Sequence, residues 1–179
     1  MDCTRLWVIR HGETEWNTQA RIQGHTDIDL NERGRWQAQQ AATALQHEGL
    51  SAVYSSDLRR ALHTAQAIAQ ACGLPLHVQP QLRERSFGAL EGRTFAEVEA
   101  EQPEAARRWR QRDPDFGPPG GETLSDFHQR CTQALVAIAQ QHLGHTVALV
   151  AHGGVLDAWY RAATAQALGA PRTDRKSVV

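Results

Sequence analysis

Four short apolar runs stand out in a chain that is otherwise largely polar. They occupy 6–9, 52–55, 76–78 and 146–151, and the third is the weakest of the four. Consecutive apolar residues over such short lengths are typical of strands that are covered on both faces, as in parallel sheets. The run over 146–151 is apolar almost throughout, and it predicts the central strand of a sheet.

Helical periodicity fills most of the chain between these runs. The clearest pattern lies in 58–72, where apolar residues recur three and four positions apart and Gly73 follows. Asn31 can cap a second helix that begins near Glu32, and Gly49 can end it. A long third helix is expected over 124–142. The residues expected to face inward from the second and third helices are Trp36, Ala38, Ala41, Ala42 and Leu45, and Leu124, Phe127, Cys131, Leu135 and Ile138.

Polar and glycine-rich segments complete the pattern. We expect loops over 10–30, 82–94 and 113–121, short helices over 95–102 and 104–112, and a last helix that begins near Val155. Strands that alternate with helices predict an α/β fold, a three-layer α/β/α sandwich with a mostly parallel central sheet. A chain of 179 residues suits one domain, so a single domain over 1–179 is expected.

Composition narrows the range of functions. The net charge is −1, which gives no overall attraction to nucleic acid or to an anionic membrane surface. The three cysteines are widely spaced and form no CxxC pair, which argues against a zinc site or a disulfide framework. Neither a signal peptide nor a membrane-spanning run is recognisable. We therefore expect a cytoplasmic protein.

Charged residues follow the predicted strands where ligands usually bind in α/β sheets. Arg10 and His11 come directly after the first strand, and His152 comes directly after the strand over 146–151. Arg60 falls in the first turn of the helix over 58–72, where free backbone N–H groups and the positive end of the helix dipole favour anions. If the strands are neighbours, these four side chains converge on one rim of the sheet.

Five blocks of sequence together resemble the histidine phosphatase superfamily, the phosphoglycerate mutase-like proteins. They occur in the family's order and cover the chain to about residue 164. The blocks are RHGET with WN (10–17), SDLRRA with TA (56–65), LRE with FG and EG (82–92), PGGET (119–123) and AHGG (151–154). One such block is a weak signal, whereas five in order are specific. The resemblance implies the phosphoglycerate mutase-like fold.

The resemblance also implies a role for each matching residue. His11 would attack phosphorus and become a phosphohistidine, with its other ring nitrogen bonded to a backbone carbonyl. Arg10 and Arg60 would clamp the phosphoryl oxygens with their planar guanidinium groups. Glu84 would protonate the leaving oxygen and later activate water. The further residues expected to bind the phosphate are His152, Asn17, Gln23, Gly24 and Gly153. A cluster of this kind would need no metal ion.

Several residues have a second interpretation that the sequence leaves open. Arg60 could be an ordinary surface arginine, and Glu84 could form a plain loop ion pair with Arg85. Glu13 could replace Glu84 as the acid, and Glu122 could either be structural or touch the substrate. The basic segment 107–112 could be a solvated helix face or a cap that helps to bind an acidic substrate.

The resemblance favours a phosphatase that hydrolyses a small phosphorylated metabolite. The family also contains phosphoglycerate mutases, which carry a longer insertion after the Glu84 block and use 2,3-bisphosphoglycerate as cofactor. The segment 92–120 is short here, so the mutase is the second hypothesis and no cofactor is expected for the first. A non-catalytic module that binds a phosphorylated ligand is a third hypothesis. It would fit a chain lacking His11, Arg60, Glu84 or His152, and all four are present.

The end of the chain departs from the family pattern. From about residue 165 it is shorter than in the family, and 170–179 is a polar stretch with no room for a further hairpin. We expect this to leave one edge of the sheet bare. A bare edge would favour formation of a homodimer.

Overall fold

The computed structural model describes residues 3–171, and its centre is a sheet of four parallel strands. The strands are β1 (Arg5–Arg10), β2 (Leu50–Ser55), β3 (Leu76–Val78) and β4 (Thr146–Ala151), in the order β1-β4-β2-β3. All pairings are parallel, so all four carboxyl ends lie at one edge of the sheet. The expected central position of β4 is confirmed, because β1 and β2 flank it on either side.

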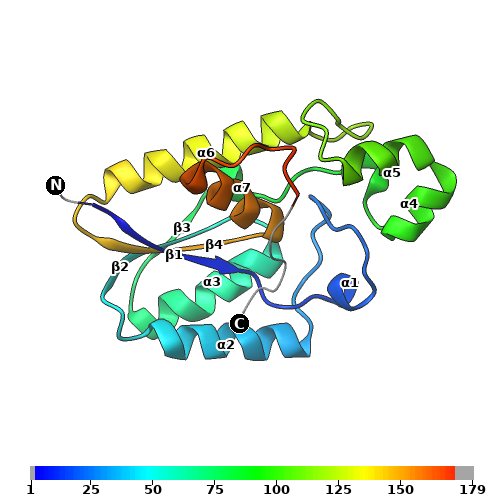
Figure 1. The fold of residues 1–179 in the computed structure, drawn as a ribbon. Coiled ribbons are helices and arrows are strands. Elements are labelled where there is room, and N and C mark those ends of the chain that lie inside the picture. Colours follow the sequence, from blue (N-terminus) through cyan, green and yellow to red (C-terminus); the bar gives the residue numbers. More distant parts are fainter. Residues whose placement is uncertain (1–2, 172–179) are drawn as a thin grey trace.

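Helices cover both faces of this sheet. Figure 1 shows α2 (Glu32–Leu45) and α3 (Arg59–Cys72) on one face, with α6 (Leu124–Gln141) and α7 (Gly153–Thr164) on the other. Alternate residues of β4 point into the two layers. Val147 and Leu149 pack with α6 and α7, whereas Ala148 and Val150 pack with α2 and α3. The three-layer α/β/α sandwich predicted from the sequence is confirmed.

Local sequence explains where the covering helices begin and end. The Asn31 side chain accepts the Gly34 N–H at 2.8 Å and caps α2. Thr123 caps α6 in the same way through the Asp126 N–H. Gly73 closes α3 in the left-handed conformation at φ +65°, which a glycine adopts without strain.

A smaller unit stands beyond the carboxyl ends of the strands. It contains α4 (Phe95–Glu101) and α5 (Pro103–Arg110), which pack around Leu90, Val98 and Ala106. Figure 1 shows these two helices apart from the sandwich, beyond the edge at which β1 and β4 end. The loops that connect this unit to the sheet therefore surround the predicted site.

Several details differ from the sequence-based predictions. Trp36 was expected in the core but is 59 % exposed, because α2 packs on α3 through Ala38, Ala42 and Leu45. The helix α2 ends at Leu45 rather than at Gly49. Further short elements lie within the expected loops or, in one case, directly before one. These are α1 (Glu15–Thr18), η1 (Pro80–Leu82) and η2 (Gly88–Leu90).

Strand β1 lies at one edge of the sheet. Among residues 3–171 only β4 pairs with it, and its apolar side chains Trp7 and Val8 are 39 % and 44 % exposed. This arrangement agrees with the expected bare edge over the part of the chain that is described. The rest of the polar C-terminal stretch, from residue 172 onward, lies outside the described residues.

Candidate active site

Two histidines meet where β1 and β4 end. Arg10 pairs with Ala151 in the parallel register, so His11 and His152 each follow the last paired residue of their strand. Their rings are 5.2 Å apart between centroids. Both side chains are buried, and the loop after β2 supplies Ser56 to the same place. The convergence on one rim follows from the pairing of these strands.

His11 is held in one tautomer by its own loop. Its Nδ1 lies 2.7 Å from the carbonyl oxygen of Gly12, and because a carbonyl only accepts, Nδ1 must carry the proton. The lone pair is therefore on Nε2. The pKa of His11 is lowered to about 3, mainly by burial and also by Arg60 and Arg10, while the Gly12 hydrogen bond acts in the opposite direction. The imidazole is consequently neutral at physiological pH.

The backbone of this loop is packed against two helices. A side chain at Gly12 would overlap the carbonyl of Gly34 in α2, so the residue must be glycine. The Gly12 N–H donates to the Thr64 hydroxyl at 3.1 Å, and that hydroxyl donates to the Arg60 carbonyl at 2.7 Å. His11 is thus fixed relative to both α2 and α3. Thr64 belongs to the second sequence block, but its role was not predicted.

Arg60 is buried in the first turn of α3, with 1 % of its surface exposed. Its Nη1 donates to the Thr26 carbonyl at 3.0 Å and its Nη2 to the Gly24 carbonyl at 2.7 Å. Its Nε has no hydrogen-bond partner among the described residues. The interpretation of Arg60 as an ordinary surface arginine is wrong. A buried guanidinium with donors left over is suited to an anion.

The loop over 23–26 is held by a carboxylate that sequence reasoning did not assign. Glu91 accepts hydrogen bonds from the backbone N–H groups of His25 and Thr26, at 2.9 and 2.8 Å, and from the Thr26 hydroxyl at 2.6 Å. Gly24 has φ +53°, and a side chain there would overlap the Glu91 carboxylate. Gly24 is therefore required by the shape of this loop. Its carbonyl in turn orients Arg60.

Asn17 and Gln23 line the cavity that His11 and Arg60 also line. The Thr14 hydroxyl lies within hydrogen-bond distance of both side-chain oxygens, 3.0 Å from Asn17 Oδ1 and 2.9 Å from Gln23 Oε1. Their side-chain nitrogens have no hydrogen-bond partner among residues 3–171. Both nitrogens can donate to an anion in the cavity.

His152 directly precedes α7 and is fully buried, so it does not itself line the cavity as Gly153 and Gly154 do. His152 Nε2 lies 2.7 Å from the Ser56 hydroxyl, while its buried Nδ1 has no partner among the described residues. Burial holds the pKa of His152 well below its ordinary value, and the nearby His11 and Arg60 act in the same direction. The helix N-terminus that follows, Gly153 and Gly154, adds its positive dipole end.

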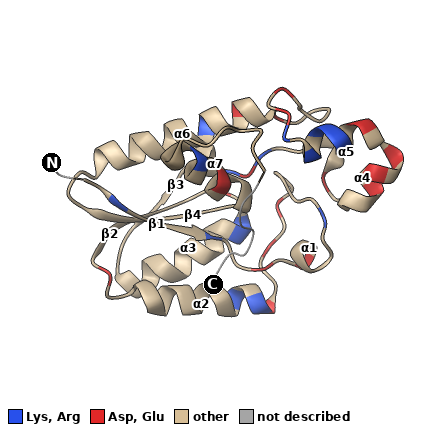
Figure 2. Ribbon diagram, viewed as in Figure 1, with Lys and Arg blue, Asp and Glu red and all other residues tan. Residues whose placement is uncertain are grey.

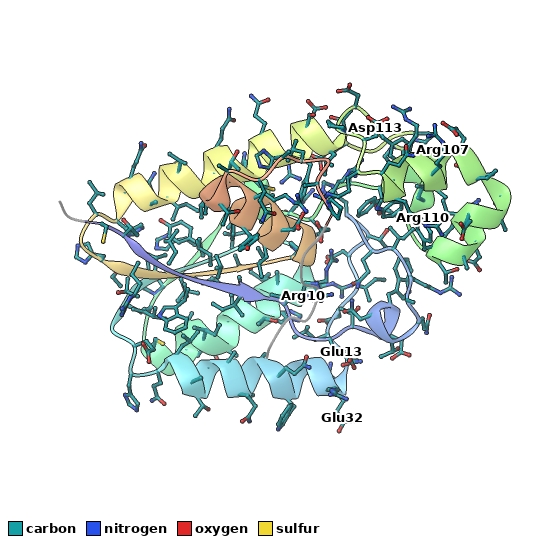
Figure 3. The ribbon with its side chains drawn as sticks, viewed as in Figure 1. Arg10, Glu13, Glu32, Arg107, Arg110 and Asp113 are labelled. Carbon is teal, nitrogen blue, oxygen red and sulfur yellow. The ribbon has the colours of Figure 1, made fainter. Side chains whose placement is uncertain are left out.

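Arg10 is the more exposed of the two predicted clamps. It lines the cavity, and none of the described residues accepts a hydrogen bond from it. Figure 3 places it at the end of β1, apart from Glu32 at the start of α2 and from Glu13, which belongs to the loop after β1. Glu13 is held there by Asn31 at 3.0 Å and does not line the cavity. This geometry disfavours Glu13 as the acid.

Glu84 reaches the cavity with both carboxylate oxygens anchored. Oε1 accepts the Arg85 N–H and Oε2 accepts the Gly154 N–H, each at 2.9 Å. A side chain at Gly154 would overlap the Glu84 carboxylate, so any larger residue there would displace that carboxylate. The side chain of Arg85 instead donates to the carbonyls of Glu122 and Phe116. A plain ion pair between Glu84 and Arg85 is therefore not formed.

The two remaining open questions have structural answers. Glu122 pairs with Arg130 and does not line the cavity, which favours its structural interpretation. In the basic segment, Arg107 pairs with Glu104 on the outside, whereas Arg110 and Arg112 line the outer cavity. Figure 2 shows acidic residues gathered on α4 and basic ones on α5. The segment is thus partly a solvated face and partly a wall of the site.

All the predicted site residues except His152 line one cavity of about 980 Å³, namely Arg10, His11, Asn17, Gln23, Gly24, Arg60, Glu84 and Gly153. Its inner end carries His11, Arg10, Arg60 and Glu84, and its outer wall includes the Trp109 ring. Among residues 3–171, no cluster of three His, Cys, Asp or Glu side chains could hold a metal ion. None of the described helices is both long and apolar enough to cross a membrane.

A comparison with protein-family models matches residues 6–176 to the histidine phosphatase superfamily, branch 1. The chain belongs to this family. The histidine phosphatase fold and the sequence blocks agree, since every block except that over 119–123 contributes residues to the cavity lining. The resemblance inferred from the sequence is confirmed.

Three members of this histidine phosphatase family show the range of relatives. Phosphoglycerate mutase-like protein 4 of Arabidopsis thaliana is 43% identical over 91% of this chain and 72% of its own length. The metal-independent phosphoserine phosphatase of the same plant is also 43% identical, over 89% and 68%. The structure of a mycobacterial glucosyl-3-phosphoglycerate phosphatase in complex with VO3 has a TM-score of 0.81 and 36% identity, over 90% of this chain and 82% of that one.

Proposed function

We propose that this chain is a phosphomonoester phosphatase that acts on a small phosphorylated metabolite through a phosphohistidine. One observation carries the proposal: His11 is neutral, with the lone pair on Nε2, in a cavity that also holds Arg60, Arg10 and Glu84. A neutral imidazole nitrogen is a nucleophile near pH 7, and the guanidinium groups attract the phosphate to it.

In the first step His11 Nε2 attacks phosphorus. The N–P bond forms while the P–O bond to the leaving group breaks, and Glu84 gives its proton to the departing oxygen. Arg10 and Arg60 neutralise the charge on the remaining phosphoryl oxygens. Asn17, Gln23 and His152 donate further hydrogen bonds, with Gly153 at the start of α7. For His152 this requires the proton on Nδ1, which the Ser56 hydroxyl permits by donating to Nε2.

In the second step water attacks the phosphohistidine. The Glu84 carboxylate takes a proton from this water, the N–P bond breaks, and inorganic phosphate leaves with His11 neutral again. The two arginines provide the positive charge that metal ions supply in other phosphoryl-transfer enzymes. No metal ion is therefore part of the proposed mechanism.

Two relatives support hydrolysis. One is a metal-independent phosphoserine phosphatase and the other a glucosyl-3-phosphoglycerate phosphatase, so both act on small phosphorylated metabolites. Another relative carries a mutase-like name. Phosphoglycerate mutase activity with 2,3-bisphosphoglycerate is therefore an outcome that the experiment must distinguish.

The proposal includes the setting of the enzyme. We place the enzyme in the cytoplasm, because Cys3, Cys72 and Cys131 are all free thiols and suit a reducing compartment. We also propose that residues 1–179 form a single domain. Its exposed β1 edge favours a homodimer. Its partner in the reaction is the phosphorylated substrate alone, without nucleic acid or membrane.

The decisive experiment combines an aryl phosphate assay with detection of the phosphoenzyme. We expect hydrolysis of p-nitrophenyl phosphate in the presence of EDTA, and an acid-labile phosphoenzyme in the wild type that is absent from His11→Ala. Loss of activity on chelation would contradict the metal-independent mechanism. Retention of labelled phosphate by His11→Ala would contradict the nucleophile.

The same preparation separates phosphatase from mutase. Supplied with 3-phosphoglycerate, with and without 2,3-bisphosphoglycerate, a phosphatase releases inorganic phosphate. Rapid interconversion of 3- and 2-phosphoglycerate without phosphate release would establish the mutase. A panel of sugar phosphates, nucleotides and phosphorylated amino acids would then define the substrate.

A further inference from the structure

Arg130 donates hydrogen bonds to three backbone carbonyls of the loop that carries Glu84. It projects from α6, and its Nη1 donates to the carbonyls of Gln81 at 2.7 Å and Arg83 at 3.1 Å. Its Nη2 donates to the carbonyl of Glu84 itself at 3.2 Å. One guanidinium thus bridges three backbone carbonyls of the segment that carries the proposed acid. Arginine suits this task because its five N–H groups lie in a fixed plane.

Glu122 completes the clamp from the other side. Arg130 binds it through two hydrogen bonds of 2.8 Å, and Glu122 Oε2 accepts the Ser86 N–H at 2.8 Å. Burial raises the pKa of Glu122, but the bonds from Arg130 and Ser86 outweigh this and hold it below its ordinary value. The ion pair therefore grips the chain at Glu84 and again two residues later.

Neither member of this ion pair reaches the substrate. Arg130 and Glu122 do not line the cavity, and their side chains are 22 % and 23 % exposed. Helix α6 is anchored in the core by Phe127, Cys131 and Ile138. The Arg130–Glu122 ion pair therefore ties the irregular segment between η1 and η2 to a helix that is anchored in the core. The Arg85 and Gly154 amides hold the Glu84 carboxylate, whereas its backbone carbonyl is held by Arg130 and by His25, whose Nε2 lies 2.8 Å away.

We propose that Arg130, paired with Glu122, is a positioning residue that holds Glu84 at the leaving oxygen. The inference rests on the proposed function, in which Glu84 is the proton donor. Proton donation matters most when the leaving group is a poor one, so a displaced Glu84 slows alkyl esters more than aryl esters. A purely architectural role for Arg130 would slow both classes equally.

The test measures leaving-group dependence in four proteins: wild type, Glu84→Gln, Arg130→Met and the double variant. Each is assayed with p-nitrophenyl phosphate and with β-glycerophosphate, whose alkoxide is a much poorer leaving group. We expect Arg130→Met to lower kcat on the alkyl ester at least tenfold more than on the aryl ester, with KM nearly unchanged. In the Glu84→Gln background the same substitution should leave the ratio of the two rates unaltered.

Arg35→Met serves as the matched control. Arg35 also donates to a backbone carbonyl, that of Leu30 at 2.6 Å, but it lies outside the cavity and has no bond to the Glu84 loop. The same chemical change there should leave the ratio of the two rates at the wild-type value.

The outcomes separate the two levels of the argument. If Glu84→Gln slows both esters equally, the proposed acid is wrong. If Glu84→Gln is selective and Arg130→Met is not, only the positioning role is overturned. Should Arg130→Met fail to fold, as judged by circular dichroism and thermal unfolding, Arg130→Lys and Glu122→Gln replace it. The same selectivity is then expected, and equal slowing by both folded variants overturns the inference.

Discussion

The imidazole of His11 is neutral because it is buried among cations, and this has a consequence for its reactivity. A proton on Nε2 would be repelled by Arg60 and Arg10 and would lose its hydration, which explains the direction of the pKa shift. The same two guanidinium groups attract a phosphate dianion. The residues that keep the nucleophile unprotonated are therefore the ones that bring its target to it.

The pair of glycines at the start of α7 gives a prediction at the scale of single residues. A side chain at Gly154 would overlap the Glu84 carboxylate, whereas at Gly153 it would lie 3.7 Å from Arg10, an ordinary contact distance. We expect Gly154→Ala to lower kcat for an alkyl phosphate by about tenfold or more, because a displacement of about 1 Å can cost two orders of magnitude. Steady-state kinetics on the purified variants measures this.

Gly153→Ala is the comparison variant for that experiment. It adds the same methyl group one position earlier in the same helix turn, without overlap. We expect a much smaller loss. Equal losses in the two variants would mean that the overlap with Glu84 is not the cause.

At the scale of elements, the contact between the loop after β1 and the start of α2 requires glycine on both sides. A side chain at Gly34 would overlap the backbone of Glu13, and one at Gly12 would overlap the backbone of Gly34. We expect Gly34→Ala to destabilise the protein by about 3 kcal/mol, since backbone atoms cannot move aside as side chains can. Urea denaturation measures the free energy of unfolding.

Gly49 provides the reference for that measurement. It has φ +64° but open space around its Cα, so Gly49→Ala tests the backbone conformation alone. We expect a loss of about 1 kcal/mol there. If the two variants lose equal stability, the overlap at Gly34 is relieved elsewhere.

The sequence predicted elements well where local pattern decides the outcome. The strand over 146–151 and the helix after Leu58 agree with the structure because periodicity and the stop at Gly73 act within a few residues. Trp36 was misplaced, since the apolar stripe of α2 could not reveal that the helix packs through alanine and leucine. The buried face of α2 packs against α3, and the pattern within α2 does not specify which element will cover it.

The candidate site shows the same division. Arg10, His11 and His152 could be placed from the strand ends, because parallel pairing brings those ends together. The roles of Glu91 and Arg130 could not be predicted, because each forms hydrogen bonds with backbone atoms far away in sequence. Almost every residue has a backbone carbonyl and an amide N–H, so no sequence motif indicates which of them a side chain will contact.

At the scale of the whole molecule, the buried histidines make stability depend on pH. The unfolded chain protonates His11 near pH 6.5, whereas the folded chain does so near pH 3, so the unfolded state binds more protons between these values. The contribution of His11 to the free energy of unfolding is therefore fully present well above pH 6.5 and is lost on acidification. At pH 5 the loss due to His11 is about 2 kcal/mol, at ~1.4 kcal/mol for each pH unit below 6.5.

Thermal unfolding in phosphate-free buffers between pH 7.5 and 5 measures this dependence. His152 shifts in the same direction and adds to the slope. His11→Asn, which removes one titrating group while keeping a polar side chain, should show a shallower decline. An identical pH profile for that variant would rule out the contribution of His11.

The exposed β1 edge gives a second prediction at this scale. Its backbone pairs only with β4 among the described residues, and Trp7 and Val8 expose apolar surface there. We expect the wild type to self-associate at this edge and Val8→Lys to weaken the association, because a lysine on an edge strand opposes pairing. Sedimentation equilibrium measures both masses, and a monomeric wild type would contradict the prediction.

Arg60 donates hydrogen bonds to the carbonyls of Gly24 and Thr26, so the stability of the segment over 22–26 should depend on whether an anion is bound in the cavity. An anion bound to Arg60 stabilises the arrangement in which that segment is closed, by about 2.7 kcal/mol at a hundredfold excess over the dissociation constant. Trypsin cleaves after Arg21, directly before the segment, and it needs the chain locally opened. Resistance to cutting at this single bond therefore ranks candidate metabolites by occupancy, even when none of them is turned over.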